Sequence, residues 1–385
     1  MRIGEFTDTF LPIVDGVGRV VHAYATELSK LEHEVTVVTP LYDTGHRGGY
    51  PFEIVDYIGY PVPTTPQYRT GSPATDAHYR KRIRMVQMDI LHAHGPFGAG
   101  REALRLAKSR KIPLIASFHS KYYDDFLKVT KSETLAKIAL SNVVSYYEKC
   151  DDVWAVSEAT ADVLRSYGYK GPLHVMPNGV TLREPTIRGR ETLAQQYPHL
   201  DTVPTLLFVG QMNWKKNILR VLEASHELLM QGIPFHLVLA GQGPDADAIR
   251  SKVEEFGLQA HCTMTGHIGD AELLDALYEK ASLFLFPSLY DNAPMVVRES
   301  AVMGTPAVLI RGSDAAEIVH HKENGLLCED SGADLARVVR DALSTPADLA
   351  GLGEAARRTI PTPWSRIMLQ VVEGYERNIK EFKGR

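Results

Sequence analysis

The chain has 385 residues, of which 44% are hydrophobic and 23% charged, and its formal net charge is −5. This length suits about two domains, and the composition is typical of a folded protein. No apolar run reaches the ~18 residues that span a membrane, and the first ten residues lack the apolar stretch of a signal peptide. Three widely spaced cysteines make neither a disulfide framework nor a zinc motif. We therefore expect a two-domain cytoplasmic protein.

Strands and helices alternate along the first half of the chain. A strand over residues 1–6 is followed by a loop over 7–18, a helix over 19–31 and a strand over 34–39. The alternation continues with strands at 90–94, 113–118, 153–156 and 174–176, and with helices at 101–109, 131–150 and 159–167. Such strand–helix–strand units place their strands parallel. We expect a doubly wound α/β domain over residues 1–180.

A second series follows a stretch punctuated by proline and arginine at 184–204. Its predicted strands are 205–209, 235–240, 262–265, 283–287 and 307–310, and its predicted helices are 218–231, 245–256, 271–280, 296–303 and 333–343. This pattern predicts a second doubly wound domain over 181–363. A last helix within 364–385 is expected to pack back on the first domain. Ligands of such sheets bind beyond the carboxyl ends of the strands, in a crevice.

One segment after a predicted strand, FPSLYDNAPMVVRESA at 286–301, is rich in polar groups. Asp291 is expected in its loop, a helix begins near Pro294, and Glu299 lies within that helix. A helix N-terminus offers free N–H groups to a phosphate, and a carboxylate can accept hydrogen bonds from sugar hydroxyls. An acid that only stabilises the start of the helix explains Asp291 equally well.

Two further loops that follow strands contain glycines. In VGQMNWKKNI at 209–218, a turn at Gly210 precedes Lys216, whose ammonium can lie against a diphosphate. In LAGQGP at 239–244, Gly241 and Gly243 allow a ligand to approach the backbone closely. Surface lysines at a helix start and a plain turn are the alternatives.

The first half has its own candidates. Gly16 and Gly18 lie between the first strand and its helix, but their spacing breaks the six-residue dinucleotide fingerprint, so an NAD-dependent oxidoreductase is the weaker alternative. His119 ends the strand at 113–118. His92 and His94 have a spacing that could ligate a metal, but no carboxylate cluster accompanies them, and we predict no metal site.

Residues 80–111 hold nine lysines and arginines against two acids. A solvated helix face explains this charge, and so does docking to an anionic lipid surface. The pI near 6.3 and the lack of interleaved aromatic residues argue against a nucleic-acid partner.

Taken together, these motifs resemble retaining glycosyltransferase family four, with the two-domain GT-B fold. The resemblance covers essentially the whole chain, from RIGEFTDTFLPIVDGVGRVV through FHSKY, AVSEAT, VMPNGV, LFVGQMNWKKN, LVLAGQGP and TGHI to FPSLYDNAPMVVRESAVMGTPAVL. It implies two Rossmann-like domains facing a crevice, and transfer of a hexose from a nucleotide sugar without a metal or cofactor. UDP-sugars are favoured over GDP-sugars by resemblance alone.

The resemblance also implies roles for single residues. The acid-x7-acid motif of the family falls on Asp291 and Glu299, and Glu299 is expected to bind the ribose. The phosphate-binding lysine falls on Lys216, and His119 matches the histidine near the transferred sugar. The implied catalytic residues are His119, Lys216 and Asp291. The implied donor-binding residues are Gly16, Gly210, Gln211, Lys216, Gly241, Gly243, His267, Asn292, Ala293, Pro294, Met295, Val296 and Glu299.

Three positions depart from the family pattern. Gln211 replaces an arginine, Asp291 replaces a glutamate, and Asn292-Ala293-Pro294 replaces Gly-Phe-Gly. The lost charge and backbone donor predict altered or weakened activity, and a non-catalytic nucleotide-sugar binder is an alternative.

The motifs of the first domain indicate the class of acceptor. FTDTFLP, HGPFG and FHSKYYDDF resemble bacterial enzymes that glycosylate diacylglycerol, which predicts a lipid acceptor, with a saccharide as the alternative. The basic stretch at 80–111 and the helix at 131–150 would suit peripheral binding to the cytoplasmic face of an anionic membrane.

Overall fold

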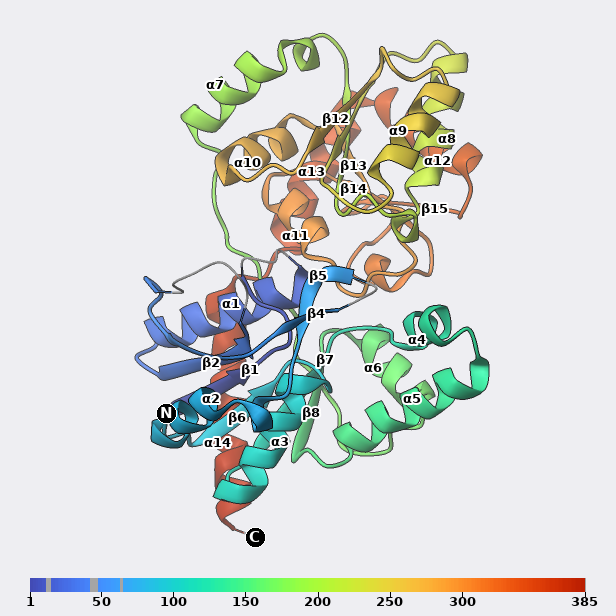
Figure 1. Ribbon diagram of the computed structural model, residues 1–385. Helices are drawn as coiled ribbons and strands as arrows, with labels where there is room; N and C mark the ends of the chain where they lie inside the picture. The colour runs from blue at the N-terminus through green and yellow to red at the C-terminus, as the bar shows by residue number, and fades with distance from the viewer. Residues whose placement is uncertain (12–14, 42–47, 63–64, 385) are drawn as a thin grey trace. The chain divides into compact units, whose positions relative to one another are not determined.

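The computed structural model describes residues 1–11, 15–41, 48–62 and 65–384, and its chain forms two compact units (Figure 1). The first unit comprises Met1–Gly179 and Trp364–Arg385, and the second comprises Val180–Pro363. Residues 12–14, within the loop predicted at 7–18, lie outside the described residues.

The first unit is built on a parallel sheet of seven strands in the order β3-β2-β1-β6-β7-β8-β9. Its central strands are buried along their whole length, as parallel strands covered on both faces must be. The strand order reverses between β1 and β6. The bounds are β1 (Arg2–Phe6), β2 (Glu34–Pro40), β3 (Glu53–Tyr57), β6 (Ile90–Ala93), β7 (Leu114–Phe118), β8 (Asp152–Ala155) and β9 (His174–Val175).

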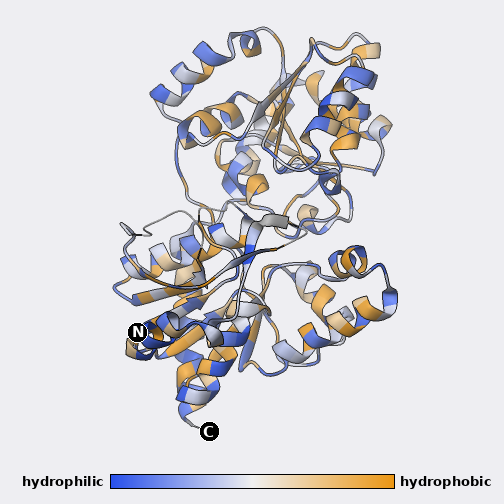
Figure 2. Ribbon diagram, viewed as in Figure 1, coloured by the Kyte–Doolittle hydropathy of each residue, from blue (hydrophilic) through white to orange (hydrophobic). Residues whose placement is uncertain are grey.

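The helices of this unit carry apolar residues on one side and polar residues on the other (Figure 2). They are α1 (Gly16–Lys30), α2 (Ala77–Met85), α3 (Gly98–Arg110), α4 (Tyr123–Thr130), α5 (Glu133–Tyr147), α6 (Glu158–Ser166) and α14 (Trp364–Lys383). Strand β4 (Tyr60–Val62) pairs antiparallel with β5 (Thr65–Thr70). Helix α14 packs closely on this unit, because a Cβ at Gly374 would lie 2.6 Å from the ring of Trp154. The rings of Tyr375 and Trp154 stack at 5.6 Å.

The second unit has a parallel sheet of six strands in the order β12-β11-β10-β13-β14-β15. Its strand order reverses between β10 and β13, as in a Rossmann fold. The strands are β10 (Thr205–Val209), β11 (His236–Ala240), β12 (Cys262–Gly266), β13 (Leu283–Leu285), β14 (Ala307–Ile310) and β15 (Leu326–Cys328). The helices are α7 (Ile187–Gln196), α8 (Ile218–Met230), α9 (Ala246–Glu255), α10 (Ala271–Lys280), α11 (Met295–Val302), α12 (Gly332–Leu343) and α13 (Pro346–Thr359).

Several elements differ from the sequence expectations. The stretch at 184–204, for which the sequence predicted no helix, contains α7, which Thr186 caps by accepting from the Gly189 backbone N–H at 3.0 Å. Gly189 lets α7 pack on α10, since a Cβ there would lie 2.3 Å from the Glu272 carbonyl oxygen. Helix α5 is shorter than the predicted 131–150. Seven further elements were not predicted from the sequence: α2, α4, α13, β3, β4, β5 and β15.

Among the described residues, no helix is both long and apolar enough to cross a membrane.

Candidate functional site

In the second unit, polar groups gather at the carboxyl ends of β10 and β13, where the strand order reverses. Strand β10 ends at Val209, and β13 ends at Leu285. The loop after β10 carries a short 3₁₀ turn, η3 (Trp214–Lys216), and the loop after β13 carries Ser288 and Asp291. Because both strands are parallel neighbours, these loops emerge at one edge of the sheet.

Lys216 and Asp291 form an ion pair across these two loops. The Lys216 ammonium lies 2.5 Å from Asp291 Oδ1, and Ser288 Oγ donates to Asp291 Oδ2 at 2.5 Å. The two charged side chains are only 16% and 18% exposed. Asp291 is in the loop, as the sequence predicts, and the structure adds that its carboxylate fixes the position of the ammonium.

This arrangement can bind an anion. An ammonium has three N–H donors, so the contact with Asp291 leaves donors for a phosphate. The first turn of α11 begins four residues after Asp291 and carries the backbone N–H groups of Met295 and Val296. Pro294 precedes them as the N-cap residue and offers no N–H.

Glu299 lies further along α11 and is only 2% exposed. Tyr278 on α10 donates a hydrogen bond of 3.5 Å to its Oε2. Burial opposes the charge on Arg183, but the bidentate contact with Asp275 outweighs it and raises the Arg183 pKa, with a smaller contribution from the field of Glu299. A carboxylate accepts several hydrogen bonds, so a ribose hydroxyl at Glu299 would share it with Tyr278.

The glycines after β11 have a structural reason to be glycine. Gly241 has φ of +143°, and a Cβ there would lie 1.8 Å from the carbonyl oxygen of Gly210. At Gly243 a Cβ would lie 2.4 Å from the carbonyl oxygen of Met212. Both glycines let the loop after β11 cross the loop after β10, where the Met212 N–H donates to the Gln242 carbonyl at 3.0 Å. Close contact between these two loops accounts for both residues without a ligand.

The remaining predicted donor residues lie in different settings. Gln211 and His267 are exposed in the loops after β10 and β12. Ala293 is 6% exposed with φ of +37°, a left-handed conformation that costs an L-residue about 1 kcal/mol. Asn292 lies beside it in the same turn. In the first unit, Gly16 is exposed in the first turn of α1, with open space where a Cβ would point.

The first unit contains a buried polar cluster, which we call the Glu5 network and define as Glu5, His92, His94, His119 and Tyr375. Glu5 Oε2 lies 2.8 Å from His94 Nε2, and His94 Nδ1 lies 3.1 Å from His119 Nε2. Tyr375 donates to Glu5 Oε1 at 2.9 Å, and its oxygen lies 2.7 Å from His92 Nδ1. The network thus links β1, β6, the end of β7 and α14.

Burial controls the protonation of this network. It raises the pKa of Glu5 to about 8, an effect that the hydrogen bond from Tyr375 only partly offsets. Burial also lowers the pKa values of His94 and His119 to about 3. At pH 7 these imidazoles are neutral, and each has one N–H donor and one acceptor nitrogen.

His119 was predicted from the sequence, but Glu5 and Tyr375 were not. The ligand atoms of Glu5, His92 and His94 lie within 4.8 Å of one another, close enough for a metal ion. Each of these atoms already has a hydrogen-bond partner, so the cluster is complete as a hydrogen-bonded network. The carboxylate that seemed missing beside the two histidines comes from β1, where Glu5 pairs in register with His92. A glutamate inside an otherwise apolar strand was the available signal.

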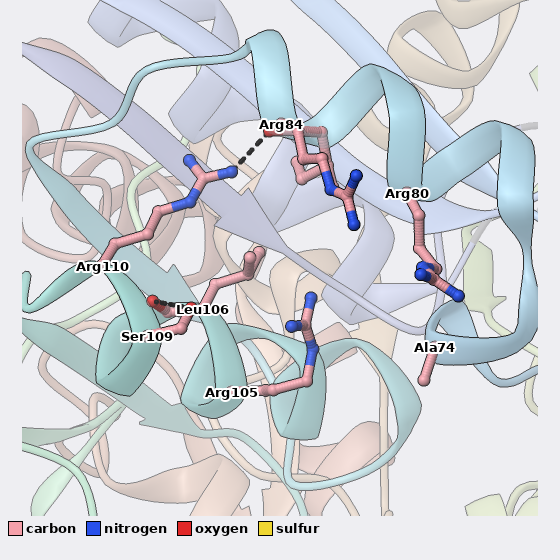
Figure 3. Close-up of a pocket in the computed structure, with 8 residues that line it drawn as sticks. Ala74, Arg80, Arg84, Arg105, Leu106, Ser109 and Arg110 are labelled. Carbon is pink, nitrogen blue, oxygen red and sulfur yellow. Dashed lines mark hydrogen bonds between the residues drawn. The ribbon is translucent and has the colours of Figure 1, made fainter.

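The basic stretch at 80–111 forms a pocket of about 370 Å³ between α2 and α3 (Figure 3). Arg110 donates to the Ile83 and Val86 carbonyls at the C-terminal end of α2, and Arg105 makes a bidentate contact with Glu102. Arg80 and Arg84 project from α2 on the other side of the pocket (Figure 3). Part of the basic charge therefore holds the two helices together, and part faces solvent.

Two Rossmann-like units in one chain are the architecture of the GT-B glycosyltransferases, and solved structures share this fold. The sucrose-phosphate synthase of Thermosynechococcus elongatus aligns with a TM-score of 0.80 at 19% identity, over 98% of this chain and 99% of that one. HepE of Anabaena, solved in complex with UDP, aligns with a TM-score of 0.76 at 16% identity, over 98% of this chain and 100% of that one.

The family follows from sequence comparison. Residues 14–184 match the model of Glycosyltransferase Family 4, and residues 189–359 match that of Glycosyl transferases group 1. The chain belongs to these glycosyltransferase families. It is 28% identical to an alpha-monoglucosyldiacylglycerol synthase of Streptococcus pneumoniae, over 91% of this chain and 80% of the relative. An enzyme of the same name from Acholeplasma laidlawii is 23% identical, over 85% of this chain and 84% of the relative.

Proposed function

We propose that this glycosyltransferase moves a hexose from a UDP-sugar to a diacylglycerol-like lipid, with retention of the anomeric configuration and without a metal ion. The observation that carries the proposal is the Lys216–Asp291 ion pair at the carboxyl edge of the second sheet. It lies where a Rossmann-like unit binds nucleotides. The names of the two lipid glycosyltransferases and the UDP complex of HepE support the choice of acceptor and donor.

The proposed reaction requires that negative charge on the leaving diphosphate be stabilised. As the bond between the anomeric carbon and the diphosphate breaks, negative charge builds on the leaving oxygen. The Lys216 ammonium, already positioned by Asp291, stabilises that charge without reorganising. The N–H groups of Met295 and Val296 at the start of α11 supply further donors. These groups take the place that a divalent cation has in metal-dependent transfer.

We propose retention of the anomeric configuration because of the names of the relatives as well as the family resemblance. Both diacylglycerol synthases and a mannosyltransferase of Corynebacterium glutamicum, 24% identical to this chain over 86% of its length and 77% of the relative, are named as alpha-forming enzymes. The glucose of UDP-glucose is itself α-linked, so an α product from this donor means retention. The mannosyltransferase is named as GDP-mannose-dependent, so a GDP-sugar is the competing donor.

A lipid acceptor requires that the first unit reach a membrane. Three large apolar side chains of α4 and α5 point to solvent: Val129, Leu135 and Ile138 are 64%, 53% and 55% exposed. Three lysines and three acids lie on the same two helices or between them, so this charge balances: Lys128, Lys131, Lys137, Asp124, Asp125 and Glu133. We propose that the apolar side chains dock on the bilayer and that Arg80 and Arg84 of α2 supply the attraction to anionic lipid.

Turnover with vesicles tests the proposal. Wild-type protein is incubated with UDP-glucose, UDP-galactose, GDP-glucose and GDP-mannose in the presence of diacylglycerol and excess EDTA, and the glycolipid anomer is read by NMR. We expect an α-glycolipid from a UDP-sugar. Lys216→Ala should lower kcat/KM by roughly 100-fold, whereas Lys215→Ala, which removes only the neighbouring ammonium, should lower it much less. Full turnover by Lys216→Ala would contradict the proposed role.

The alternatives give different results in the same assay. A thermal shift with UDP-sugars but no product with any acceptor would favour the non-catalytic binder that the departures at Gln211 and Asn292–Pro294 suggest. Product from a soluble saccharide but not from diacylglycerol would reject the lipid acceptor.

Vesicle sedimentation tests the membrane surface separately. Binding should require anionic lipid and should weaken as salt rises from about 50 to 500 mM, because salt screens exposed charges. The double variant Leu135→Ser, Ile138→Ser should lose most binding. Leu182→Ser in the second unit, at a side chain 56% exposed, is the matched control and should bind normally. Equal binding of both variants would reject this surface.

A further inference from the structure

The pocket between α2 and α3 in the first unit is lined by four arginines, two from each helix (Figure 3). We call it the arginine pocket and define it by Arg80, Arg84, Arg105 and Arg110. We infer that it is a binding site for a phosphate monoester, carried either by a small soluble molecule or by a lipid headgroup. This site is independent of the proposed function, because neither the sugar donor nor the acceptor is needed to form it.

Two of the arginines are held in place by the fold. Arg110 donates to the backbone carbonyls of Ile83 and Val86, so it ties α3 to the C-terminal end of α2. Arg105 makes a bidentate contact with Glu102, which is only 4% exposed. A guanidinium has five N–H donors, and each of these arginines uses two of them in these contacts. Both side chains are therefore positioned in advance and still have donors for a ligand.

The other two arginines lack such contacts. Within the described part of the chain, neither Arg80 nor Arg84 forms an ion pair or a side-chain hydrogen bond. They stand four residues apart on α2, where two like charges repel each other and destabilise a helix. Figure 3 shows Arg84 and Arg105 extending toward each other from opposite helices, with Arg80 beside them. An anion bound between these three side chains would offset that repulsion.

The charge of the pocket favours a phosphate monoester over a diester. The four arginines contribute four positive charges and Glu102 one negative charge, which leaves a net charge of +3. A monoester carries about −1.5 to −2 at pH 7 and has three terminal oxygens, whereas a diester carries one charge and has two such oxygens. Planar guanidinium groups bind such oxygens in pairs. None of the other described lining residues is an acid that would repel an anion: they are Ala74, Ile83, Leu106 and Ser109.

The arginine pocket lies toward the amino ends of the strands of the first sheet. Helix α3 begins after the carboxyl end of β6 and runs back toward the start of β7, so Arg105 and Arg110 in its second half are remote from that end. His119 follows the carboxyl end of β7, at the opposite edge of the sheet. The volume of about 370 Å³ is within the range of small-molecule sites. A bound monoester would therefore bridge α2 and α3 without occupying the edge where ligands of doubly wound sheets bind.

Calorimetric titration with glycerol 3-phosphate tests the soluble form of the ligand. We expect saturable binding to the wild type at low salt, and weaker binding of the diester glycerophosphoglycerol. The double variant Arg80→Gln, Arg84→Gln should raise the Kd for glycerol 3-phosphate roughly tenfold or more, because charge-assisted hydrogen bonds are lost. The matched control Lys81→Gln, Lys108→Gln removes two exposed charges from the same pair of helices outside the pocket, and should change the Kd by less than about twofold.

Vesicle sedimentation tests the lipid form of the ligand. Vesicles that contain phosphatidate, a monoester, or phosphatidylglycerol, a diester, are matched in zeta potential, so that general attraction to an anionic surface is equal. We expect the wild type to bind the phosphatidate vesicles more than about threefold more tightly. The Arg80→Gln, Arg84→Gln variant should lose this preference, and the lysine control should keep it.

The two experiments separate the sources of the phosphate. Binding of glycerol 3-phosphate shows that a soluble monoester is sufficient, whereas a preference for phosphatidate without such binding assigns the ligand to a lipid headgroup. Absence of both overturns the inference, as does an equal loss in the arginine and lysine double variants. Loss of glycerol 3-phosphate binding in Lys216→Ala would place that binding in the second unit and also overturn it. Neither experiment requires turnover, so failure of the proposed function would leave both results unchanged.

Discussion

Glu5 should make the stability of the first unit depend on pH. In the unfolded chain Glu5 ionises near pH 4.5, but in the folded protein it keeps its proton to about pH 8. Between these values the folded state binds more protons than the unfolded state, so the free energy of unfolding falls as pH rises. The full slope for one group is about 1.4 kcal/mol per pH unit, which gives a loss of about 3 kcal/mol between pH 5.5 and 7.5.

The measurement is urea unfolding of the wild type and Glu5→Gln at pH 5.5, 6.5 and 7.5, followed by tryptophan fluorescence. Trp154 and Trp364 report on the first unit, and Trp214 can be replaced by phenylalanine in both proteins. The buried histidines, whose lowered pKa values act in the opposite direction on acidification, are the same in both proteins and cancel in the difference. We expect the wild type to lose about 3 kcal/mol relative to Glu5→Gln across this range. Parallel pH curves would refute the reasoning.

Two other predictions concern backbone geometry in the second unit. Gly241→Ala should lower the free energy of unfolding by about 3 to 5 kcal/mol, because its Cβ would lie 1.8 Å from a carbonyl oxygen. The control Gly269→Ala, with open space at its Cβ, should lower it by less than about 1 kcal/mol. Thermal unfolding measures both variants, and equal melting temperatures would contradict the crossing of the two loops. Ala293→Val should lower the free energy of unfolding by about 2 kcal/mol, because a β-branched residue tolerates φ of +37° poorly. Ala293→Gly should change it by less than about 1 kcal/mol. A valine variant as stable as the wild type in the same assay would argue against the left-handed turn.

The order of strands and helices was largely readable from the sequence. Strands such as β10, β11 and β14 are short apolar runs that end at Gly, Pro or polar residues, and they are buried on both faces, so the chemistry of each segment identifies it locally. Helix α7 was not readable, because its apolar pattern is weak and its stability comes from packing against α10. Helix propensity is a weak guide to secondary structure where tertiary packing stabilises the helix.

The candidate site was likewise predicted in part from the sequence and determined in part by the tertiary structure. The sequence by itself predicted Lys216 and Asp291 as site residues, since each follows a predicted strand and falls on a motif of the family that the chain resembles. Only the tertiary structure joined them in an ion pair, because the two residues are 75 positions apart and meet only when β10 and β13 become neighbours. It likewise brought Glu5 and Tyr375, 370 positions apart, to His92 on β6 and His94 directly after it. A sequence states which chemical groups a chain carries, but burial and partners set their protonation, and both arise only when distant segments pack together.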